Sequence, residues 1–318
     1  MDPLSDLLRI VRLDGAYFYG VEAAEPWSAE TLPAAQLTPR IMPASEHLIS
    51  YHILTQGKCW GVVAGHDPVE LSAGDVIVFP HGDAHQMCSA PGVRTGRDVY
   101  KSLPERYPFT VNLSHAGAPT TSIVCGFLGC DRRPFNPLLA SLPRIVVVRR
   151  MSNDWLGNFV RQVTEDSRQG RSGARGVLTR LAELMFVEVL RRYVDDLPAG
   201  HTGWLAGLRD EVVGKALGLL HERPGRAWTL VTLAKGVGTS RSNLARRFTG
   251  LMGQPPMKYL AQWRMQVAAH LLTQSDAKLS AVGSEVGYDS EAAFSRAFKK
   301  ATGVSPGAWR EGGRQREP

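Results

Sequence analysis

The sequence predicts an α+β protein of two domains: a small N-terminal β-barrel or sandwich, a helical connector, and an all-α C-terminal domain. Two patterns carry this prediction. Short apolar runs broken by turn residues occupy residues 47–85, whereas residues 230–310 contain an internal repeat with helical spacing. The length of 318 residues agrees, because it exceeds one ordinary domain and suits two.

The composition excludes several classes of protein. Hydrophobic residues make up 43% of the chain and charged residues 21%, so the chain can bury cores and is not disordered by default. No stretch reaches the roughly 18 apolar residues that a membrane-spanning helix needs. Residues 1–14 lack the apolar centre of a signal peptide, and four cysteines form no dense disulfide framework. We therefore expect a soluble, cytoplasmic protein without membrane contact.

The first domain is expected to consist of short strands. Its apolar runs are separated by turn residues, which favours a small barrel or sandwich. The segment 94–121 contains proline and glycine and is long for a connection, so we expect either a disordered loop or a lid over the mouth of the barrel. The expected strands are residues 51–54, 59–63, 69–71 and 76–79.

Two helices are expected between the domains, at residues 151–169 and 174–196. The second is apolar on nearly every side, and such a helix must be buried. It can pack against the barrel of its own chain or against a second copy, and we expect a homodimer. The expected boundaries are residues 1–150 for the first domain, 151–200 for the connector and 201–318 for the second domain.

The positive charge is confined to the second domain. Of the net charge of +7, residues 201–318 contribute +8 and residues 1–200 contribute −1. A compact basic domain beside a neutral one is typical of proteins that bind nucleic acids, because the release of counterions from phosphates drives association. On charge alone, a basic surface kept for solubility is the alternative.

A repeat with an offset of 50 residues organises the second domain. The stretch LARRF at residues 244–248 matches FSRAF at residues 294–298. Downstream, Gly253, Pro256 and Tyr259 match Gly303, Pro306 and Trp309. A repeat of this length and register indicates two copies of one structural unit.

Each copy has the pattern of a helix-turn-helix. In the first copy, Thr229 is expected to cap a helix at residues 230–235, and Ser240 a second helix at residues 241–249. The equivalent second helix of the other copy is expected at residues 291–300, with Ser290 as its cap.

A strong helical pattern at residues 256–273 joins the two copies. Apolar side chains recur there every four residues, at Tyr259, Trp263, Val267 and Leu271. A rigid helix at this place would fix the separation of the two helix-turn-helix units. Their second helices could then enter successive major grooves on one face of a DNA duplex, roughly 34 Å apart.

Three stretches of the second domain match a known family: LAKGVGTSRSNLARRF, GQPPMKYLAQWRMQVAAHLL and VGSEVGYDSEAAFSRAFKKATGVSPGAWR. Over residues 208–310 the chain resembles the DNA-binding domain of the AraC/XylS family of bacterial transcription regulators. The resemblance implies that both second helices read base pairs. The positions it implies are Ser242, Ala245 and Arg246 in the first helix and Ala292, Ser295 and Arg296 in the second.

Arg241 and Lys299 lie on the same outward faces, and Lys299 is expected to contact phosphate. Arginine suits base reading because its planar fork pairs with both acceptors of guanine. A structural alternative exists for Arg246 and Arg296, which is pairing with nearby acids such as Glu222 or Glu285. Ala245 and Ala292 could contact only the methyl group of thymine.

A pattern in the first domain also matches a known motif. Gly74, Pro80, Gly82 and His85 have the spacing G-x5-P-x-G-x2-H, which resembles the second signature motif of cupins. The stretches MDPLSDLL, YHILTQGKCW, LSAGDVIVFPHGDAH and CGFLGCD are similar to the cupin sensor domain of one AraC subgroup. The resemblance implies a cupin-like β-barrel that binds a small-molecule effector. The partners it implies are this effector, double-stranded DNA, a second copy of the chain and, as a further candidate, RNA polymerase.

Four side chains are candidate effector ligands, namely His52, Trp60, His81 and His85. For His85 the alternative is a structural histidine whose hydrogen bonds are satisfied within the protein. The histidines could instead converge with Cys125 on zinc or iron, which would make the protein a metal-dependent cupin enzyme fused to a DNA-binding module. Against this, no second histidine follows His52 at +2, and the first cupin motif is not evident. A catalytic acid–base pair and a nucleophile motif are also missing from the sequence. We therefore expect no metal, no cofactor and no enzymatic activity.

Overall fold

The computed structural model describes residues 2–11, 13–95, 109–114, 117–149 and 173–314, and these form two compact units. The sheet unit contains Leu13–Cys130 and Leu142–Asp195. The helical unit contains Asp196–Pro318 together with Met1–Arg12 and Asp131–Ser141. The prediction of a sheet-rich N-terminal domain and a helical C-terminal domain is confirmed. Two segments of the first 150 residues, Met1–Arg12 and Asp131–Ser141, thus pack with the C-terminal helices.

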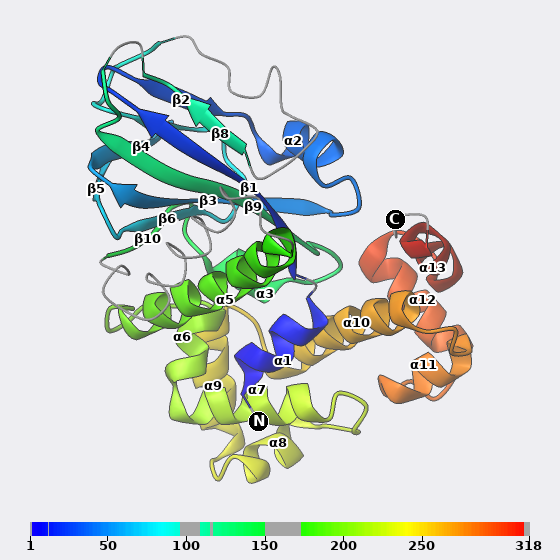
Figure 1. The fold of residues 1–318 in the computed structure, drawn as a ribbon. Coiled ribbons are helices and arrows are strands. Elements are labelled where there is room, and N and C mark those ends of the chain that lie inside the picture. The colour runs from blue at the N-terminus through cyan, green and yellow to red at the C-terminus, as the bar shows by residue number, and fades with distance from the viewer. Residues whose placement is uncertain (1, 12, 96–108, 115–116, 150–172, 315–318) are drawn as a thin grey trace. The chain divides into compact units, whose positions relative to one another are not determined.

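The strands of the sheet unit form two sheets (Figure 1). The larger has six strands in the order β10-β6-β3-β9-β1-β8, and the smaller has four in the order β2-β7-β4-β5. The strands expected in residues 51–79 are all present, as β3 to β6. The bounds are β1 Leu13–Ala23, β2 Ser28–Thr31, α2 Ala34–Ile41, β3 His47–Gln56, β4 Lys58–Val63, β5 Val69–Ser72, β6 Val76–Phe79, β7 His85–Cys88, β8 Phe109–Asn112, β9 Thr121–Cys130 and β10 Val146–Val148.

The hydrophobic core of the sheet unit takes side chains from both sheets. Inward residues alternate along β4, where Cys59 and Val63 belong to the core while Trp60 between them is half-buried on the opposite face. Trp27 and Phe127 are among the largest core side chains, and each is at most 1% exposed. The central strand β9 is buried along its whole length, which explains why its sequence is apolar without alternation.

Helix α5 (Ala174–Asp195) packs against β1 and β10 of the sheet unit. Its buried side chains include Met185 and Phe186, each 1% exposed. Of the two predicted partners of this helix, the sheets of its own chain or a second copy, the structure shows the first. Val177 and Leu184, seven residues apart, remain 43% and 51% exposed. The other connector helix expected, at residues 151–169, lies outside the described residues.

The segment 94–121 contains a short strand, β8, in place of an uninterrupted loop or lid. β8 pairs in parallel with β1 at the edge of the larger sheet, from Tyr19 opposite Phe109 to Glu22 opposite Asn112. Residues 96–108 and 115–116 of this segment lie outside the described part of the chain.

The helical unit contains the two expected helix-turn-helix copies, joined by α10 (Figure 1). The side chains of Thr229, Ser240 and Ser290 each accept a hydrogen bond from a backbone N–H in the first turn of the following helix, which confirms the predicted caps. The bounds are α1 Pro3–Ile10, α3 Pro137–Ser141, α6 Trp204–Arg209, α7 Glu211–Glu222, α8 Leu230–Gly236, α9 Arg241–Met252, α10 Pro256–Gln274, α11 Leu279–Glu285, α12 Glu291–Thr302 and α13 Pro306–Arg314.

A buried aromatic cluster forms the centre of the helical unit. The indole Nε1–H of Trp204 donates to the hydroxyl of Tyr259 at 2.8 Å, and Nε2 of His221 lies 2.7 Å from the same oxygen. The ring of His221 stacks on Trp263 with 3.9 Å between centroids. Burial lowers the pKa of His221 to about 3, so this imidazole is neutral.

Two segments from the first half of the chain complete this unit. Leu4 and Leu7 of α1 are buried, and α1 packs on α7 and α10. In the segment Asp131–Ser141, the backbone N–H of Phe135 donates to Oε1 of the buried Gln266 at 2.9 Å. Neither packing arrangement follows from the repeat, because both depend on residues more than 100 positions away along the chain.

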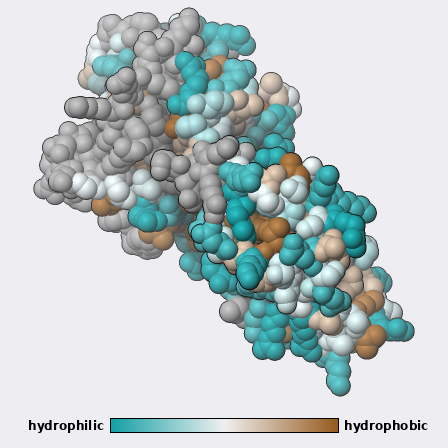
Figure 2. Space-filling view, turned by 90° about the vertical axis from the view of Figure 1, so that its right-hand side faces the viewer, coloured by the Kyte–Doolittle hydropathy of each residue, from teal (hydrophilic) through white to brown (hydrophobic). Residues whose placement is uncertain are grey.

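Among the described residues, no helix combines the length and the apolar composition required to cross a bilayer. Among the coloured residues of the face drawn in Figure 2, hydrophilic ones are frequent and the hydrophobic ones form small groups. Within the described part of the chain, the large hydrophobic side chains that are exposed are Val177, Leu184, Val231 and Val304.

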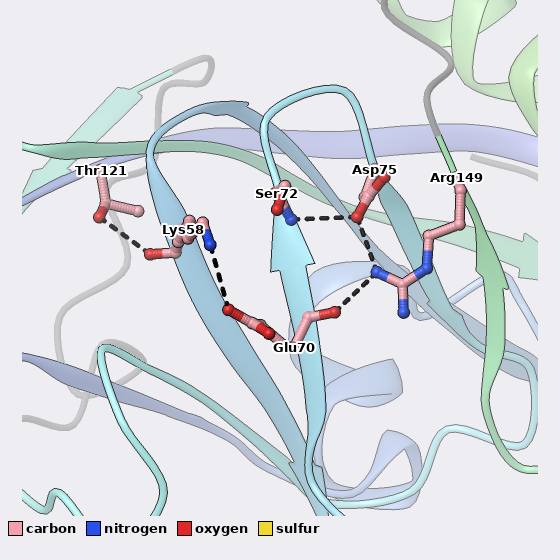
Figure 3. Close-up of polar contacts among 6 residues, drawn as sticks. All are labelled: Lys58, Glu70, Ser72, Asp75, Thr121 and Arg149. Carbon is pink, nitrogen blue, oxygen red and sulfur yellow. Dashed lines mark hydrogen bonds and ion pairs between the residues drawn. The ribbon is translucent and has the colours of Figure 1, made fainter.

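Arg149 connects the end of β10 to the turn between β5 and β6 (Figure 3). Its Nη1 donates to the carboxylate of Asp75 at 2.7 Å and to the carbonyl of Glu70 at 2.6 Å. The side chain of Asp75 is 5% exposed. The neighbouring pair of Lys58 with Glu70 is 3.5 Å long, and its side chains are 73% and 50% exposed.

Arg149→Met should lower the free energy of unfolding by about 1–2 kcal/mol, because it removes a charged donor from a buried carboxylate. Lys58→Met is the matched control and should change it by less than about 0.5 kcal/mol, since exposed ion pairs contribute little. Denaturant titration of both variants at neutral pH measures the two values. Equal losses would contradict this difference between the pair with a buried carboxylate and the pair in which both side chains are exposed.

Candidate nucleic-acid interface and buried histidine cluster

The second helices of the two copies, α9 and α12, present equivalent outward faces. Each buries two apolar side chains four residues apart, Leu244 and Phe248 in α9 and Phe294 and Phe298 in α12. The residues predicted to contact DNA lie on the remaining surface. Arg241, Ser242, Arg246, Ala292, Arg296 and Lys299 are exposed, and Ala245 and Ser295 are half-buried.

A short chain of hydrogen bonds holds Arg246 on α9. Nη2 of Arg246 donates to Oδ1 of Asn243 at 3.1 Å, and Nδ2 of Asn243 donates to the hydroxyl of Thr239 at 2.8 Å. In the second copy Ala293 occupies the position of Asn243, so this support for Arg296 is missing. Sequence reasoning did not single out Asn243, although its spacing of three residues from Arg246 is the signal that could have identified it.

The ion pairs of α9 distinguish its two consecutive arginines. Arg247 pairs with Asp210, whose other carboxylate oxygen caps α7, so its charge is used within the protein. Among the described residues, Arg246 and Arg296 form no ion pair with an acid. The alternative partner Glu222 pairs with Arg223 instead, at 3.4 Å. The positive charge of Arg246 and Arg296 is therefore available to a ligand.

A row of hydrogen-bonded polar side chains crosses the core of the sheet unit. On adjacent strands of the larger sheet, Nδ1 of His52 lies 3.0 Å from Sγ of Cys125. The other ring nitrogen of His52, Nε2, lies 2.8 Å from Nε2 of His85 on the smaller sheet. Nδ1 of His85 lies 2.8 Å from the carbonyl of Asp83. Two of the four candidate effector ligands are thus in direct contact.

The chemistry of these partners fixes the protons. A carbonyl only accepts, so Nδ1 of His85 carries a hydrogen and, in the neutral ring, Nε2 accepts. Nε2–H of His52 is then the donor between the two rings. This leaves Nδ1 of His52 to accept from the thiol of Cys125, which in turn accepts from the hydroxyl of Tyr19. Every ring nitrogen of the pair is satisfied with both rings neutral.

Burial keeps both imidazoles neutral. It lowers the pKa of His85 to about 4, against the opposing effect of the hydrogen bond to Asp83. Burial, and secondarily the neighbouring His85, hold the pKa of His52 well below its ordinary value. Burial also raises the pKa of the Cys125 thiol, which therefore keeps its proton. The ring of His85 stacks on Phe79 with 3.7 Å between centroids, so the cluster is enclosed by apolar surface.

The other two candidate effector ligands are not part of this cluster. His81 is exposed, and its Nε2 donates to the carbonyl of Leu142 at 2.9 Å. Trp60 lies on the face of β4 opposite to the core. Their positions follow from the turn before β7 and from the alternation of β4, neither of which the spacing of the motif determines.

The described residues contain no group of three or more histidine, cysteine or acidic side chains arranged to hold a metal ion. His52 and His85 direct their Nε2 atoms at one another at hydrogen-bond distance, which leaves no space for an ion between them. The donor set in this core therefore fits a hydrogen-bonded pair better than a metal centre.

Comparison with known proteins identifies both parts of the chain. Residues 2–195 match the family model described as a cupin, and residues 233–312 match the model described as a helix-turn-helix domain. A putative AraC-like transcription regulator from Streptomyces antibioticus is 30% identical over 98% of this chain and 99% of its own length. The counterpart from Streptomyces lividans is 30% identical over 98% of each chain.

Solved structures of similar proteins include the DNA-binding domain of the transcription factor AdpA in complex with a target DNA. It is 30% identical over 34% of this chain and 97% of that chain, with a TM-score of 0.32. ToxT from Vibrio cholerae O395 is 11% identical over 95% of this chain and 98% of that chain, with a TM-score of 0.36.

Acidification should destabilise the protein through His85. The unfolded chain binds a proton at the ordinary histidine pKa of about 6.5, whereas the folded chain binds it only near pH 4. The stability due to the neutral ring is therefore complete above pH 6.5 and is lost as the pH falls toward 4. Between pH 6.5 and pH 5 this one group should cost on the order of 2 kcal/mol.

Denaturant titration at pH 7 and pH 5 measures this loss, which His85→Gln should reduce. The exposed His66 provides a control, since His66→Gln should leave the loss unchanged. A pH dependence that stays the same in His85→Gln would show that the ring is not buried in its neutral form.

Proposed function

Because the chain belongs to the AraC-like transcription regulators and carries a cupin domain and a helix-turn-helix domain, we propose that α9 and α12 read base pairs in successive major grooves. The cupin part would bind a small-molecule effector that controls this reading. The observation that carries the proposal is the matched pair of outward faces, each with an arginine that no acid within the described residues neutralises.

The residues have distinct roles in this proposal. Arg246 and Arg296 pair with guanine, and Ser242 and Ser295 donate to or accept from base edges. Ala245 and Ala292 pack against thymine methyl groups. Arg241 and Lys299 contact phosphates, which adds affinity but no sequence preference.

The effector is proposed to interact with the histidine cluster of the sheet unit. His52 and His85 are two of the buried polar groups of the sheet unit, and a ligand with a hydrogen-bonding group can exchange partners with them. His81 and Trp60 are not included, because their side chains do not face the core. An effector changes DNA binding only if it binds one state of the protein better than the other.

We further propose that the protein is a homodimer. We also propose that it acts in the cytoplasm as a regulator without enzymatic activity, and that RNA polymerase is a further partner. The exposed Val177 and Leu184 support dimerisation, because seven-residue spacing puts them on one side of α5. An exposed apolar stripe of this kind is stabilised when a second copy covers it.

Selection of bound duplexes from a random pool at two salt concentrations tests the proposed function. We expect enrichment of a motif with two blocks about one helical turn apart. Binding without enrichment that weakens steeply with salt would mean that the helices contact phosphates only, and would overturn base reading.

Arg246→Ala should cost about 1–3 kcal/mol of binding free energy on the selected duplex and relax the preference at one or two base pairs. Lys299→Ala is the matched control in the other copy. It should weaken binding to selected and random duplexes by similar factors and reduce the salt dependence by about one counterion. Titration of both duplexes with each variant gives these values. Equal losses on both duplexes for Arg246→Ala would exclude a reading role.

Leu184→Glu should shift the protein toward the monomer, because a carboxylate in an apolar contact must be desolvated. Sedimentation analysis across concentrations measures the shift from twice 34.8 kDa to 34.8 kDa. Lys215→Glu, a charge change at an exposed position of α7 outside this stripe, is the control. A wild-type protein of 34.8 kDa at all concentrations would contradict the proposed dimer.

A further inference from the structure

Besides α10, a direct contact between two glycines links the loop that precedes the first helix-turn-helix copy to the turn of the second copy. Gly225 lies in the loop between α7 and α8, and a Cβ atom there would come within 2.3 Å of the carbonyl oxygen of Glu285 at the end of α11. Gly287 follows α11, and a Cβ atom there would lie 2.7 Å from the carbonyl oxygen of Gly225. No side chain larger than hydrogen fits between the two backbones at this contact.

Arg264 of α10 fills the corner where the two copies meet. Its Nε donates to the carbonyl of Pro224 at 2.8 Å, and its Nη2 donates to the carbonyl of Arg226 at 2.9 Å. The same Nη2 lies against Gly287, where a Cβ atom would approach it to 2.7 Å. One half-buried guanidinium therefore contacts both the loop that precedes the first copy and the turn of the second copy.

The loop that accepts the hydrogen bonds of Arg264, residues 223–229, is held by further contacts. The backbone N–H of Trp228 donates to the carbonyl of Arg226 at 2.7 Å, and its indole Nε1–H donates to the carbonyl of Arg223 at 3.0 Å. The guanidinium of Arg226 lies 4.2 Å from the centre of the Trp228 ring. The next residue, Thr229, caps α8. A shift of this loop would therefore move the start of the first copy.

The turn of the second copy, which contains Gly287, lies immediately before α12. Gly287 has a φ of +84°, a conformation that side chains rarely adopt, and Ser290 caps α12 three residues later. The ring of Tyr288 lies 5.9 Å from that of the buried Phe294 in α12. The position of this turn and the position of α12 are therefore linked.

We propose that Arg264, together with the contact of Gly225 and Gly287, is a positioning clamp that fixes the distance and rotation between α9 and α12. By this means it determines which spacing between two DNA blocks the protein accepts. The inference rests on the proposed reading of two successive grooves. It adds a residue that sets specificity without contacting a base.

The geometry explains why α10 alone would not fix the distance and rotation between α9 and α12. A helix of 19 residues is stiff, but the short turns at its two ends can each act as a hinge. Hydrogen bonds from a guanidinium to two carbonyls hold the orientation of one copy, and the glycine contact limits the approach of the other. A change of one base pair in the spacing moves the second block by about 3.4 Å and turns it by roughly 35°. A clamped protein cannot follow such a change without breaking these contacts.

The test uses the full chain and the duplex recovered from the random pool, in versions whose two blocks are one base pair closer or farther apart. Wild-type affinity should fall about tenfold for either change, a loss similar to that caused by a mismatched base pair. Arg264→Ala removes both hydrogen bonds, and Gly225→Ala inserts a methyl group into the backbone contact. In each variant the same change of spacing should cost less than about threefold.

Two control variants match these changes. Lys258→Ala removes an exposed positive charge from the same helix, and Gly307→Ala adds a methyl group to α13 where nothing lies within 4 Å of it. Both should keep the tenfold loss. Thermal unfolding of all variants identifies any that do not fold, and a variant that is merely destabilised would bind all three duplexes more weakly by one common factor.

The possible outcomes separate the two proposals. Loss of the spacing preference in Arg264→Ala and Gly225→Ala, with both controls unchanged, supports the clamp. A preference that remains at the wild-type tenfold in both variants overturns the clamp and leaves the reading of two grooves intact. A wild-type protein that accepts all spacings equally overturns both.

Discussion

The buried hydroxyl of Tyr259 constrains the helical unit more than any other single group. A polar atom in a dry interior must keep its hydrogen bonds, and this oxygen has Trp204 of α6 and His221 of α7 as partners. The rings of Phe135 and Phe248 pack edge-on against Tyr259, at 5.5 and 5.8 Å between centroids. One side chain therefore positions five elements, namely α6, α7, its own helix α10, the segment Asp131–Ser141 and α9. The outward face of α9 is a consequence of this packing.

A comparable constraint operates in the sheet unit. The hydrogen bonds among Cys125, His52 and His85 satisfy every ring nitrogen, and the surrounding apolar side chains keep water away. An effector that enters this core must replace the hydrogen bonds it breaks, since a buried polar group left unpaired costs about 1–3 kcal/mol. In the proposed effector role, the cluster would select ligands by the pattern of donors and acceptors that they offer. It also couples the two sheets, which each contribute one histidine.

The two copies of the repeat have similar backbones but differ in the side chains around their outward-facing arginines. Asn243 holds Arg246 in place before DNA arrives, whereas Ala293 gives Arg296 no such support. A long side chain that is ordered only on binding loses conformational entropy at that step. Glu291 also stands where the first copy has Arg241, which reduces the attraction to phosphate. In the proposed reading of two grooves, the first copy is therefore expected to be the stronger base reader, and the proposed clamp would let the weaker copy contribute.

The repeat, the caps at Ser240 and Ser290 and the main strands were determined by the sequence itself, because periodicity and capping act over a few residues. The tertiary structure decided what depends on distant partners. It assigned Arg247 to Asp210 and left Arg246 facing outward, and it brought His52 to His85 but not to His81. It also placed α1 and Asp131–Ser141 in the helical unit. Spacing along the chain carries no record of such contacts, because they arise only when separate elements pack together.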